Sequence, residues 1–496
     1  MNQAATDAKR VPPARGAGAA GGENSDDAAT SVISLYAKQQ KIYARAVSGW
    51  FAGWRWAFVW ATQLVFYGLP WLQWNGRQAV LFDLGARRFY IFGMVLYPQD
   101  FIYLTALLLI SAYSLFLFTA VAGRLWCGFA CPQTVYTEIF MWVERKIQGD
   151  RSARMRRDAG PWTFDRSWRA AAKQTAWIAI ALWTGFTFVG YFTPIHTLAQ
   201  LASQFALGPW ESFWVFFYGL ATYGNAGFLR EQVCKYMCPY ARFQSVMFDK
   251  DTLIISYDPE RGEPRGSRSR KADYKAQGKG DCIDCTLCVQ VCPTGIDIRN
   301  GLQYECISCT ACIDVCDGVM DKMGYPRGLI RFDTQNAMTQ HLTPEQRRKR
   351  VFRPRVLVYS AILVLLVGAL GASMALRSPF RVDVVRDRAS LARIVDEGQI
   401  ENVYRLQIMN ATEATQHYRV AVKGLPGMAL AGGGESIEVQ PAEARWVTAA
   451  VRVAPEAAAQ AGPGAHAIEF EVERLPQQPG DSAVRAVEKS TFVVPR

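Results

Sequence analysis

Eight of the twelve cysteines in this chain lie in two consecutive runs with identical spacing. Each run reads C-x2-C-x2-C-x3-C, and the members are Cys282, Cys285, Cys288 and Cys292, followed by Cys306, Cys309, Cys312 and Cys316. This spacing is typical of chains that bind two [4Fe–4S] clusters through cysteine thiolates. Zinc sites and disulfides are the alternatives, but zinc sites rarely use two consecutive runs of four cysteines with a following proline, here Pro293. The sequence therefore predicts two iron–sulfur clusters and one-electron chemistry.

The ligands of the two clusters are expected to cross between the runs. Two-residue gaps wrap a loop around three corners of a cubane, so the fourth corner must be reached from elsewhere, and in bacterial ferredoxins it is reached from the other run. One predicted set is Cys282, Cys285, Cys288 and Cys316, and the other is Cys306, Cys309, Cys312 and Cys292. One departure from the usual pattern is Asp317, which stands where a second proline is common.

The four remaining cysteines form two C-x3-C-P motifs, each at the end of an apolar segment and just after a basic residue. The motifs are Cys127 and Cys131 with Pro132, and Cys234 and Cys238 with Pro239. An i, i+4 spacing places both thiols on one helix face. The proline disfavours the helical conformation at the residue before it and opens the last turn. A helix pair that ends in two thiols, occurring twice, indicates two parallel repeats.

Pairing of the two motif helices would bring these four thiols together. Soft thiolates favour Cu(I), zinc or another iron–sulfur centre over hard cations. The neighbouring Arg124 and Arg230 are expected to lower the thiol pKa and so favour the ligating thiolate. Each pair could instead cycle between dithiol and disulfide, or the four cysteines could simply pack. Spacing alone leaves a copper site, a further cluster and a redox dithiol open.

Five long apolar segments predict a membrane domain. A helix of ~20 residues with a rise of ~1.5 Å per residue spans the ~30 Å hydrocarbon core of a bilayer. The segments cover about 54–74, 99–126, 174–194, 210–229 and 356–376. The last carries no charged residue, and aromatic residues gather at the ends of the first and the fourth, as in interfacial belts. We expect an α-helical bundle of about five transmembrane helices.

The net charge of +12 comes largely from basic loops between the apolar segments. Ten Lys or Arg residues lie at positions 124–173, and none lies at positions 195–209. By the positive-inside rule, the N-terminus and the cysteine runs face the cytoplasm and the C-terminus faces outward. Cluster thiolates also require a reducing compartment, which independently places the runs inside. No nucleic-acid-binding motif accompanies the charge, so membrane lipid rather than nucleic acid is the expected partner.

The residues after the fifth apolar segment form seven short stretches of alternating polar and apolar side chains, separated by Gly, Pro and Asn. Seven short strands at this spacing predict an immunoglobulin-like β-sandwich. This region has no cysteine, so we expect a docking surface rather than a redox site. Its histidines, His417 and His466, are expected on the surface.

His196, at the outer end of the third apolar segment, could meet a quinone or a metal at the outer membrane face, and a solvated position there is favoured.

These features divide the chain into five parts. The predicted parts are a disordered N-terminal tail (1–35), a four-helix membrane domain with both C-x3-C-P motifs (36–250), a cytoplasmic ferredoxin domain with two clusters (251–350), a fifth transmembrane helix (351–376) and a periplasmic immunoglobulin-like domain (377–496). The tail is rich in Ala, Gly, Asp and Asn and lacks an apolar core, which is typical of a disordered segment rather than a signal peptide.

The combination of two membrane motifs, a ferredoxin insertion, a final helix and an immunoglobulin-like tail resembles the family of the cytochrome c oxidase accessory protein CcoG, also called FixG or RdxA. The resemblance covers about 36–496. It implies a multi-pass protein of the bacterial inner membrane that acts in making cbb(3)-type oxidase and reduces Cu(II) to Cu(I) for copper delivery. The implied partners are the oxidase or copper chaperones, with no particular electron donor. The implied copper-handling, catalytic thiols are Cys127, Cys131, Cys234 and Cys238.

Two other functions fit the same residues. Quinol-linked subunits of the NapH type are similar in the four-helix part and in the clusters but lack the tail, and in this interpretation the membrane repeat binds quinone while the clusters relay electrons. A non-enzymatic scaffold for oxidase assembly would instead use the clusters as structural elements and the tail to recruit partners. The three interpretations differ in what the protein should react with. Reduction of copper favours the first, quinol-dependent bleaching of the clusters favours the second, and the absence of both reactions favours the scaffold.

Overall fold

The structure of the chain is a computed structural model. The residues that it describes are 41–495 without 388–391, 432–435 and 477–482. The tail predicted for residues 1–35 lies outside the described residues. All elements below belong to the compact unit of the chain that begins at Ile42.

Helices occupy all five apolar segments, with bounds that differ from the predicted ones. They are α1 (Trp50–Gly68), α2 (Phe101–Ala122), α6 (Phe164–Val189), α8 (Pro209–Tyr223) and α15 (Pro354–Ala375). Within the described residues, two helical stretches are long and apolar enough to cross a membrane, Pro98–Ala122 and Pro354–Ala375. These two helices are compatible with a membrane protein. Because the other three helices do not meet the same length and hydropathy criteria, a bundle of five spanning helices stays a prediction.

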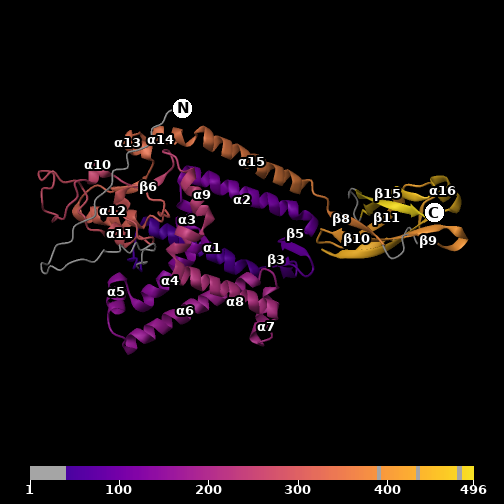
Figure 1. The fold of residues 1–496 in the computed structure, drawn as a ribbon, viewed down its shortest axis with the longest axis horizontal. Helices are drawn as coiled ribbons and strands as arrows, with labels where there is room; N and C mark the ends of the chain where they lie inside the picture. The colour runs from indigo at the N-terminus through magenta and orange to yellow at the C-terminus, as the bar shows by residue number, and fades with distance from the viewer. Residues whose placement is uncertain (1–40, 388–391, 432–435, 477–482, 496) are drawn as a thin grey trace, which may run out of the picture. The chain divides into compact units, whose positions relative to one another are not determined.

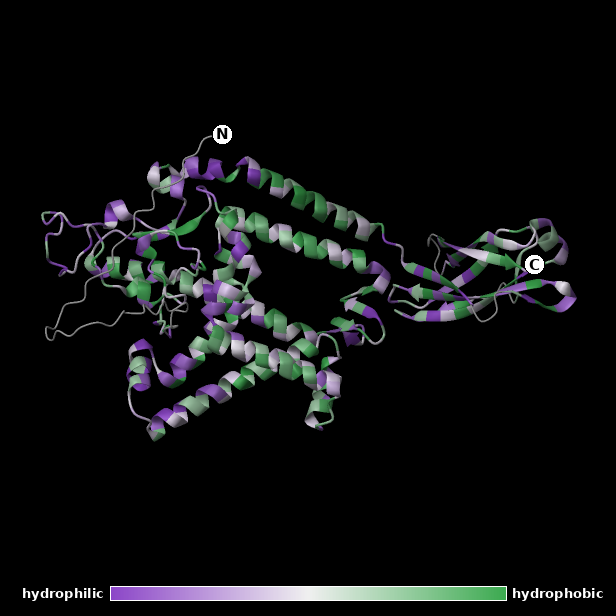
Figure 2. Ribbon diagram, in the orientation of Figure 1, coloured by the Kyte–Doolittle hydropathy of each residue, from purple (hydrophilic) through white to green (hydrophobic). Residues whose placement is uncertain are grey.

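The two most apolar helices, α2 and α15, lie side by side (Figures 1 and 2). The Tyr103 hydroxyl of α2 donates a hydrogen bond to the Ser373 carbonyl of α15 at 3.3 Å. The helices α6 and α8 approach more closely, because a Cβ atom at Gly185 would lie 2.2 Å from the Val215 carbonyl oxygen. Close approach at small residues is a common way for membrane helices to pack.

Short strands between α1 and α2 are absent from the sequence-based expectations. They are β1 (Gln73–Trp74), β2 (Arg77–Gln78), β3 (Val80–Asp83), β4 (Arg88–Ile91) and β5 (Met94–Leu96). Buried Gln78 ties this region to the helices. Its side-chain amide donates to the Val80 and Gly190 carbonyls, both at 2.7 Å, and accepts from the Ile195 backbone N–H at 2.9 Å.

The cysteine runs lie in a small region closed by two antiparallel strands, β6 (Ile254–Tyr257) and β7 (Ile330–Asp333). The helices α11 (Leu287–Gln290) and α12 (Ala311–Met323) pack against each other, and each begins one residue before the third cysteine of its run. The buried core between these elements includes Ile255, Ile313, Met320 and Leu329.

The other α-helices lie within or between these parts. They are α3 (Leu125–Phe129), α4 (Pro132–Gln148), α5 (Arg151–Ala159), α7 (Ile195–Ser203), α9 (Pro239–Met247), α10 (Pro259–Gly262), α13 (Gln335–Thr339), α14 (Pro344–Val351) and α16 (Pro455–Ala461), with two π-helical turns at Gly224–Leu229 and Val233–Met237.

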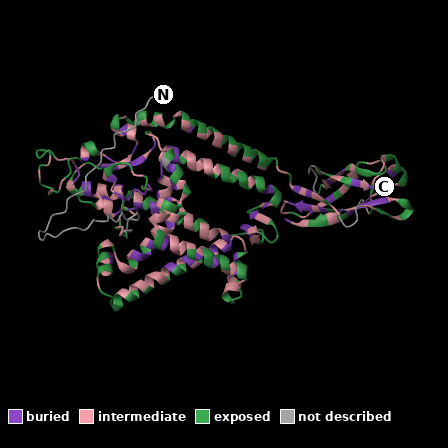
Figure 3. Ribbon diagram, viewed as in Figure 1, coloured by how far each residue is buried: buried purple, intermediate pink, exposed green. Residues whose placement is uncertain are grey.

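All seven predicted strands of the C-terminal region are present, in two antiparallel sheets. One sheet has the order β12–β14–β10–β8, with β9 beside β10, and the other has the order β13–β11–β15–β16. The bounds are β8 (Phe380–Arg386), β9 (Arg393–Ile394), β10 (Ile400–Asn410), β11 (Gln416–Lys423), β12 (Ala429–Ala431), β13 (Ile437–Val439), β14 (Ala444–Val453), β15 (Gly464–Arg474) and β16 (Val484–Val494). Tyr404, Leu406, Phe470 and Phe492 are fully buried in the shared core. Figure 3 shows buried residues along the strands of this region.

Candidate metal centres

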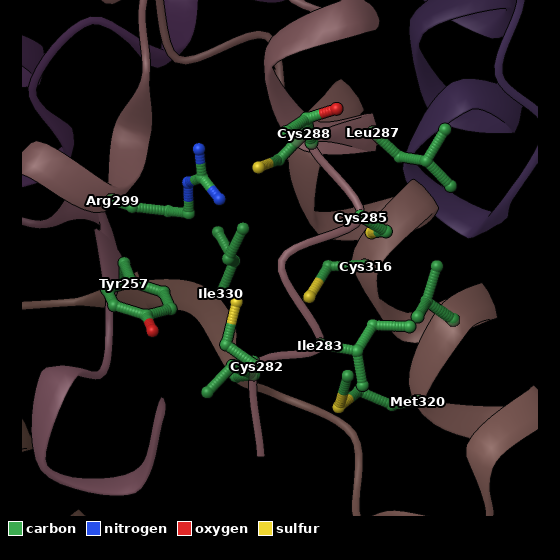
Figure 4. A pocket seen from close by; sticks show the side chains of 13 residues that line it. Tyr257, Cys282, Ile283, Cys285, Leu287, Cys288, Arg299, Cys316, Met320 and Ile330 are labelled. Atoms are coloured by element: carbon green, nitrogen blue, oxygen red, sulfur yellow. The ribbon is translucent and has the colours of Figure 1, made fainter. Parts of the chain in front are cut away.

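The first cluster set is the group Cys282, Cys285, Cys288 and Cys316, which the structure brings together around one pocket (Figure 4). Cys316 belongs to the second run and lies on α12, from where it interacts electrostatically with the other three. The packing of α11 on α12 is what brings the two runs together. Within this set Cys282 and Cys288 are buried, whereas Cys285 is exposed.

The second cluster set is the group Cys306, Cys309, Cys312 and Cys292. Cys312 interacts electrostatically with the other three members, and Cys292 is the member that comes from the first run. The Cys292 thiol also lies 3.3 Å from the Thr294 hydroxyl. Cys312 also interacts with Cys288 of the first set, so the two sets are neighbours, and the crossed division of ligands stays a prediction.

The two runs share a backbone feature that wraps each loop. The residues on either side of the second cysteine are left-handed in both runs: Asp284 and Thr286 in the first, with φ of 54° and 56°, and Ser308 and Thr310 in the second, with φ of 54° and 63°. Residues other than glycine seldom adopt this conformation, and it persists where the surrounding structure requires it. Such tight reversals suit a loop that folds around the corners of a cubane.

The electrostatics of these thiols also suit a cluster. Burial raises the pKa of Cys306 and Cys316 to about 12 and that of Cys288 to about 11. A thiol with such a pKa stays protonated at neutral pH unless a metal takes the place of its proton. These groups of mostly buried thiols fit [4Fe–4S] clusters, whose irons would supply the missing positive charge.

The C-x3-C-P motifs are junctions between helices, and this corrects the prediction that both thiols of a motif share one helix face. Cys127 lies on α3, which ends at Phe129, and Cys131 is extended, with φ −62° and ψ 129°, as the cap of α4. Cys234 lies in the π-helical turn Val233–Met237, and Cys238 is the extended cap of α9. The prolines cause the break, because they exclude the helical conformation from the residue before them.

The membrane quartet is the group Cys127, Cys131, Cys234 and Cys238, which the structure brings together from both motifs. Cys127 interacts electrostatically with Cys131 and Cys234, and Cys238 with Cys131 and Cys234. The Cys127 thiol lies 3.5 Å from the Gln244 amide oxygen of α9, the helix that follows the other motif. The two motifs are therefore parts of one site.

The prediction that neighbouring arginines lower the thiol pKa is wrong for Cys127 and Cys234. Burial raises the pKa of Cys127 to about 12 and that of Cys234 to about 11, although Arg124 acts in the opposite direction on both. The loss of water around a buried thiolate outweighs the attraction of one cation. These thiols would become thiolates only when a metal binds.

The second cluster set packs directly against the membrane quartet. Cys127 and Cys234 contact the buried group that contains Ile307 and Cys309. A Cβ atom at Gly128 would lie 2.7 Å from the Ser308 carbonyl oxygen and 2.8 Å from the Cys309 Cα, so the two backbones touch there. Sequence reasoning missed this contact. The available sequence signal was Gly128 between Cys127 and Cys131, because a glycine permits another backbone to approach closely.

Further contacts fix this docking. Lys235 donates to the Thr294 carbonyl at 2.9 Å, and Arg124 donates to the Tyr304 carbonyl. At the start of α1, the Asp314 carboxylate of α12 accepts from the Phe51 and Ala52 backbone N–H groups at 3.1 and 2.7 Å. A carboxylate at a helix N-terminus stabilises the helix and satisfies its free donors.

The contacts of His196, His417 and His466 involve none of the twelve cysteines. The exposed His196 ring contacts Trp71, with 5.4 Å between ring centroids. His417 contacts the Ser436 hydroxyl at 3.3 Å, and His466 contacts the Gly462 carbonyl at 2.8 Å. No metal or quinone role follows from these contacts.

Family models match three parts of the chain. A 4Fe–4S dicluster domain matches residues 229–335, a 4Fe–4S binding domain matches residues 104–149, and the Ig-like fold at the C-terminus of FixG matches residues 370–495. The first covers both cysteine runs and the second C-x3-C-P motif, and the second covers the first such motif.

Several curated proteins are similar over most of the chain. The nitrogen fixation protein FixG of Rhizobium meliloti is 37% identical over 81% of this chain and 83% of its own. The proteins RdxA and RdxB of Cereibacter sphaeroides are each 38% identical, over 79% and 89% of this chain and 84% and 93% of their own. A crystal structure of a FixG-related protein from Vibrio parahaemolyticus is 25% identical, covering 24% of this chain and 97% of its own, with a TM-score of 0.19.

These similarities place the chain in a defined class, that of membrane-compatible iron–sulfur proteins with a C-terminal immunoglobulin-like domain. The chain belongs to the FixG/RdxA family. Its 4Fe–4S domains indicate iron–sulfur electron transfer, which confirms the prediction made from the cysteine runs.

Proposed function

We propose that this chain is an iron–sulfur oxidoreductase that reduces Cu(II) to Cu(I) for the assembly of a cbb(3)-type cytochrome oxidase. One observation carries the proposal: the membrane quartet packs directly on the second cluster set, through the contact of Cys127 and Cys234 with the group around Cys309. Clusters supply one-electron chemistry when bound. A single electron is what the step from Cu(II) to Cu(I) consumes, with copper as the substrate.

The burial of the two cluster sets gives the path a direction. Cys285 of the first set is exposed, so a cytoplasmic electron donor can reach that set. The second set is covered by the motif residues Cys127 and Gly128, so it is the set that faces the membrane quartet. The residues thus support entry at the first set and exit at the quartet.

The helix α15 supports the placement of electron entry on one side of the inner membrane and partner docking on the other. It runs from Pro354 to Ala375 and is long and apolar enough to span a bilayer. The cysteine runs precede it and the immunoglobulin-like domain follows it. In this proposal the runs are cytoplasmic, and the periplasmic domain docks the oxidase or a copper chaperone.

The experiment that tests the proposal removes half of the quartet. The double variant Cys127→Ser, Cys131→Ser should lose Cu(II) reduction in purified protein while the clusters of the two runs remain visible by absorbance and EPR. Unchanged reduction with intact clusters would exclude these thiols from the reaction.

A second candidate function, quinol-linked electron transfer, is favoured by a cavity of about 850 Å³ between α1, α4 and α6. Aromatic side chains line it, among them Trp56, Trp60, Trp142 and Trp183. Gln63 also lines it, and its buried side-chain oxygen has no hydrogen-bond partner among the described residues. A flat ring that carries a hydroxyl group fits such a site. Quinol-dependent cluster bleaching without any response to copper would favour this function over copper reduction.

A further inference from the structure

We infer that the membrane quartet holds a third [4Fe–4S] cluster, with two ligands from each C-x3-C-P motif. The inference goes beyond the proposed function, because it concerns the cofactor at the quartet and stands whether or not copper is the substrate. Cys127, Cys131, Cys234 and Cys238 would each ligate one iron, as the cysteines of the runs do in their own clusters.

Contacts outside the thiols hold the two motifs together. Arg124, next to the first motif, donates to the Ala241 carbonyl of α9, which follows the second motif. Gln133 of α4, which follows the first motif, donates to the Arg230 carbonyl before the second motif at 3.1 Å. These reciprocal bonds tie each motif to the flank of the other, so all four thiols belong to one prearranged site.

The quartet has the number of ligands that a cubane requires, with one thiol for each iron. Within the part of the chain that the structure describes, no three His, Cys, Asp or Glu side chains converge closely enough to hold one metal ion. The cysteines of the two cluster sets do not converge on one point either, although they lie in the region that matches the 4Fe–4S dicluster family. A mononuclear copper or zinc site draws its ligand atoms to ~2.0–2.3 Å from one point, whereas a cubane keeps its four thiolates apart on separate irons.

A disulfide also fits less well than a cluster. The structure has all four quartet residues as free cysteines, like the eight cysteines of the runs. The quartet therefore shares with both cluster sets the number of thiols and the lack of disulfides.

Two buried arginines lie where the quartet meets the second cluster set, and both favour anionic groups beside them. Arg124 is 4% exposed and Arg55 is 7% exposed, and within the described residues neither forms an ion pair with a carboxylate. The Nε atoms of both have no hydrogen-bond partner there. Arg124 interacts electrostatically with Cys127 and Cys234 of the quartet and with Cys306 of the second cluster set, whereas Arg55 interacts with Cys309 of the second set. A buried cation without a counter-charge is costly, so an anionic cluster at the quartet would help to balance Arg124.

The family models agree with this division of ligands. The 4Fe–4S binding domain at residues 104–149 contains only two cysteines, Cys127 and Cys131. Two thiols are half of the ligands that a cubane requires. The structure supplies the other half from Cys234 and Cys238.

The test is the iron and acid-labile sulfide content of anaerobically purified full-length protein, together with EPR and Mössbauer spectra. We expect about twelve irons per chain in the natural protein and about eight in the variant Cys131→Ser, Cys238→Ser, with loss of one set of cluster signals. The matched control, Cys282→Ser, Cys285→Ser, should lose about four irons with a different set of signals.

About eight irons in the natural protein, or copper or zinc bound to the quartet in a one-to-one ratio, would overturn the inference. Should the quartet variant fail to fold, the iron count and Mössbauer spectrum of the natural protein still decide the question. The outcome is separable from the proposed function. About twelve irons without Cu(II) reduction would contradict only the function, and about eight irons with Cu(II) reduction would contradict only the third cluster.

Discussion

The backbone of Gly128, inside the first membrane motif, lies against the backbone of Cys309 in the second cysteine run. A Cβ atom at position 128 would lie 2.8 Å from both the Cα and the N atom of Cys309. Only glycine fits between these backbones without displacement. This contact joins two regions that are far apart in the sequence, and it brings a cluster ligand beside the membrane thiols.

The substitution Gly128→Ala should therefore loosen the docking of the second cluster set on the quartet. Overpacking of this kind costs about 1–3 kcal/mol. We expect lower thermal stability and slower Cu(II) reduction, with the iron content unchanged. The matched control is Gly53→Ala on α1, where an added Cβ atom meets nothing within 4 Å. Equal rates and stabilities for the two variants would show that the contact does not matter.

The crossed grouping of the cysteines predicts which signals each variant loses. Cys316→Ser should remove the same cluster signals as Cys282→Ser, and Cys292→Ser the same as Cys309→Ser, each with a loss of about four irons. The reason is that Cys316 lies with the first cluster set and Cys292 with the second. EPR spectra of the reduced variants make the comparison. Should Cys292→Ser instead match Cys282→Ser, each run would hold its own cluster.

Glu144 should be among the most sensitive carboxylates of the membrane domain. It is 1% exposed and pairs with Arg154 at 2.9 Å, Arg230 at 3.0 Å and Lys173 at 3.6 Å. Glu144→Gln removes the carboxylate that these three cations share, and loss of one member of a buried ion pair typically costs about 3–5 kcal/mol. Thermal unfolding in detergent measures the loss. The control Glu345→Gln breaks an exposed pair with Lys349 and should change stability by less than about 1 kcal/mol.

The same carboxylate gives a pH dependence with a definite sign. Burial alone would raise the pKa of Glu144, but Arg230, Arg154 and Lys173 outweigh burial and hold the pKa below its ordinary value of 4.5. The stabilisation is therefore fully present above pH 4.5 and is lost as the pH falls below it. Unfolding curves from pH 7 to pH 3 should converge for the natural protein and Glu144→Gln at the acid end. Parallel curves would contradict this role.

The proposed topology predicts opposite results for reporters on the two sides of α15. A phosphatase fused after Arg496 should be active, because the enzyme needs the oxidising periplasm, and one fused after Arg350 should be inactive. A fluorescent protein that folds only in the cytoplasm should give the reverse pattern. The helix between them is 22 residues long, or ~33 Å at ~1.5 Å per residue, enough to cross a bilayer once. Activity of both phosphatase fusions would rule out a cytoplasmic ferredoxin domain.

Much of the fold is readable from local sequence patterns. The spacing of the cysteine runs predicts the iron–sulfur domain, because ligand spacing reflects the geometry of the cubane itself. Alternation along stretches such as Ile400–Asn410 predicts the β-sandwich, because side chains of a strand alternate between core and solvent. The prolines at positions 132 and 239 require extended cysteines before them, and both are extended.

The tertiary structure alone decides how these parts meet. Gly128 and Cys309 touch although the chain between them is long, and no periodicity encodes such a pairing. The burial that raises the pKa of Cys127 comes from several segments at once, whereas the adjacent Arg124 suggested the opposite direction. Local patterns report what each segment buries or ligates. Which segments share a site depends on long-range packing, and this packing places the membrane quartet against the second cluster set.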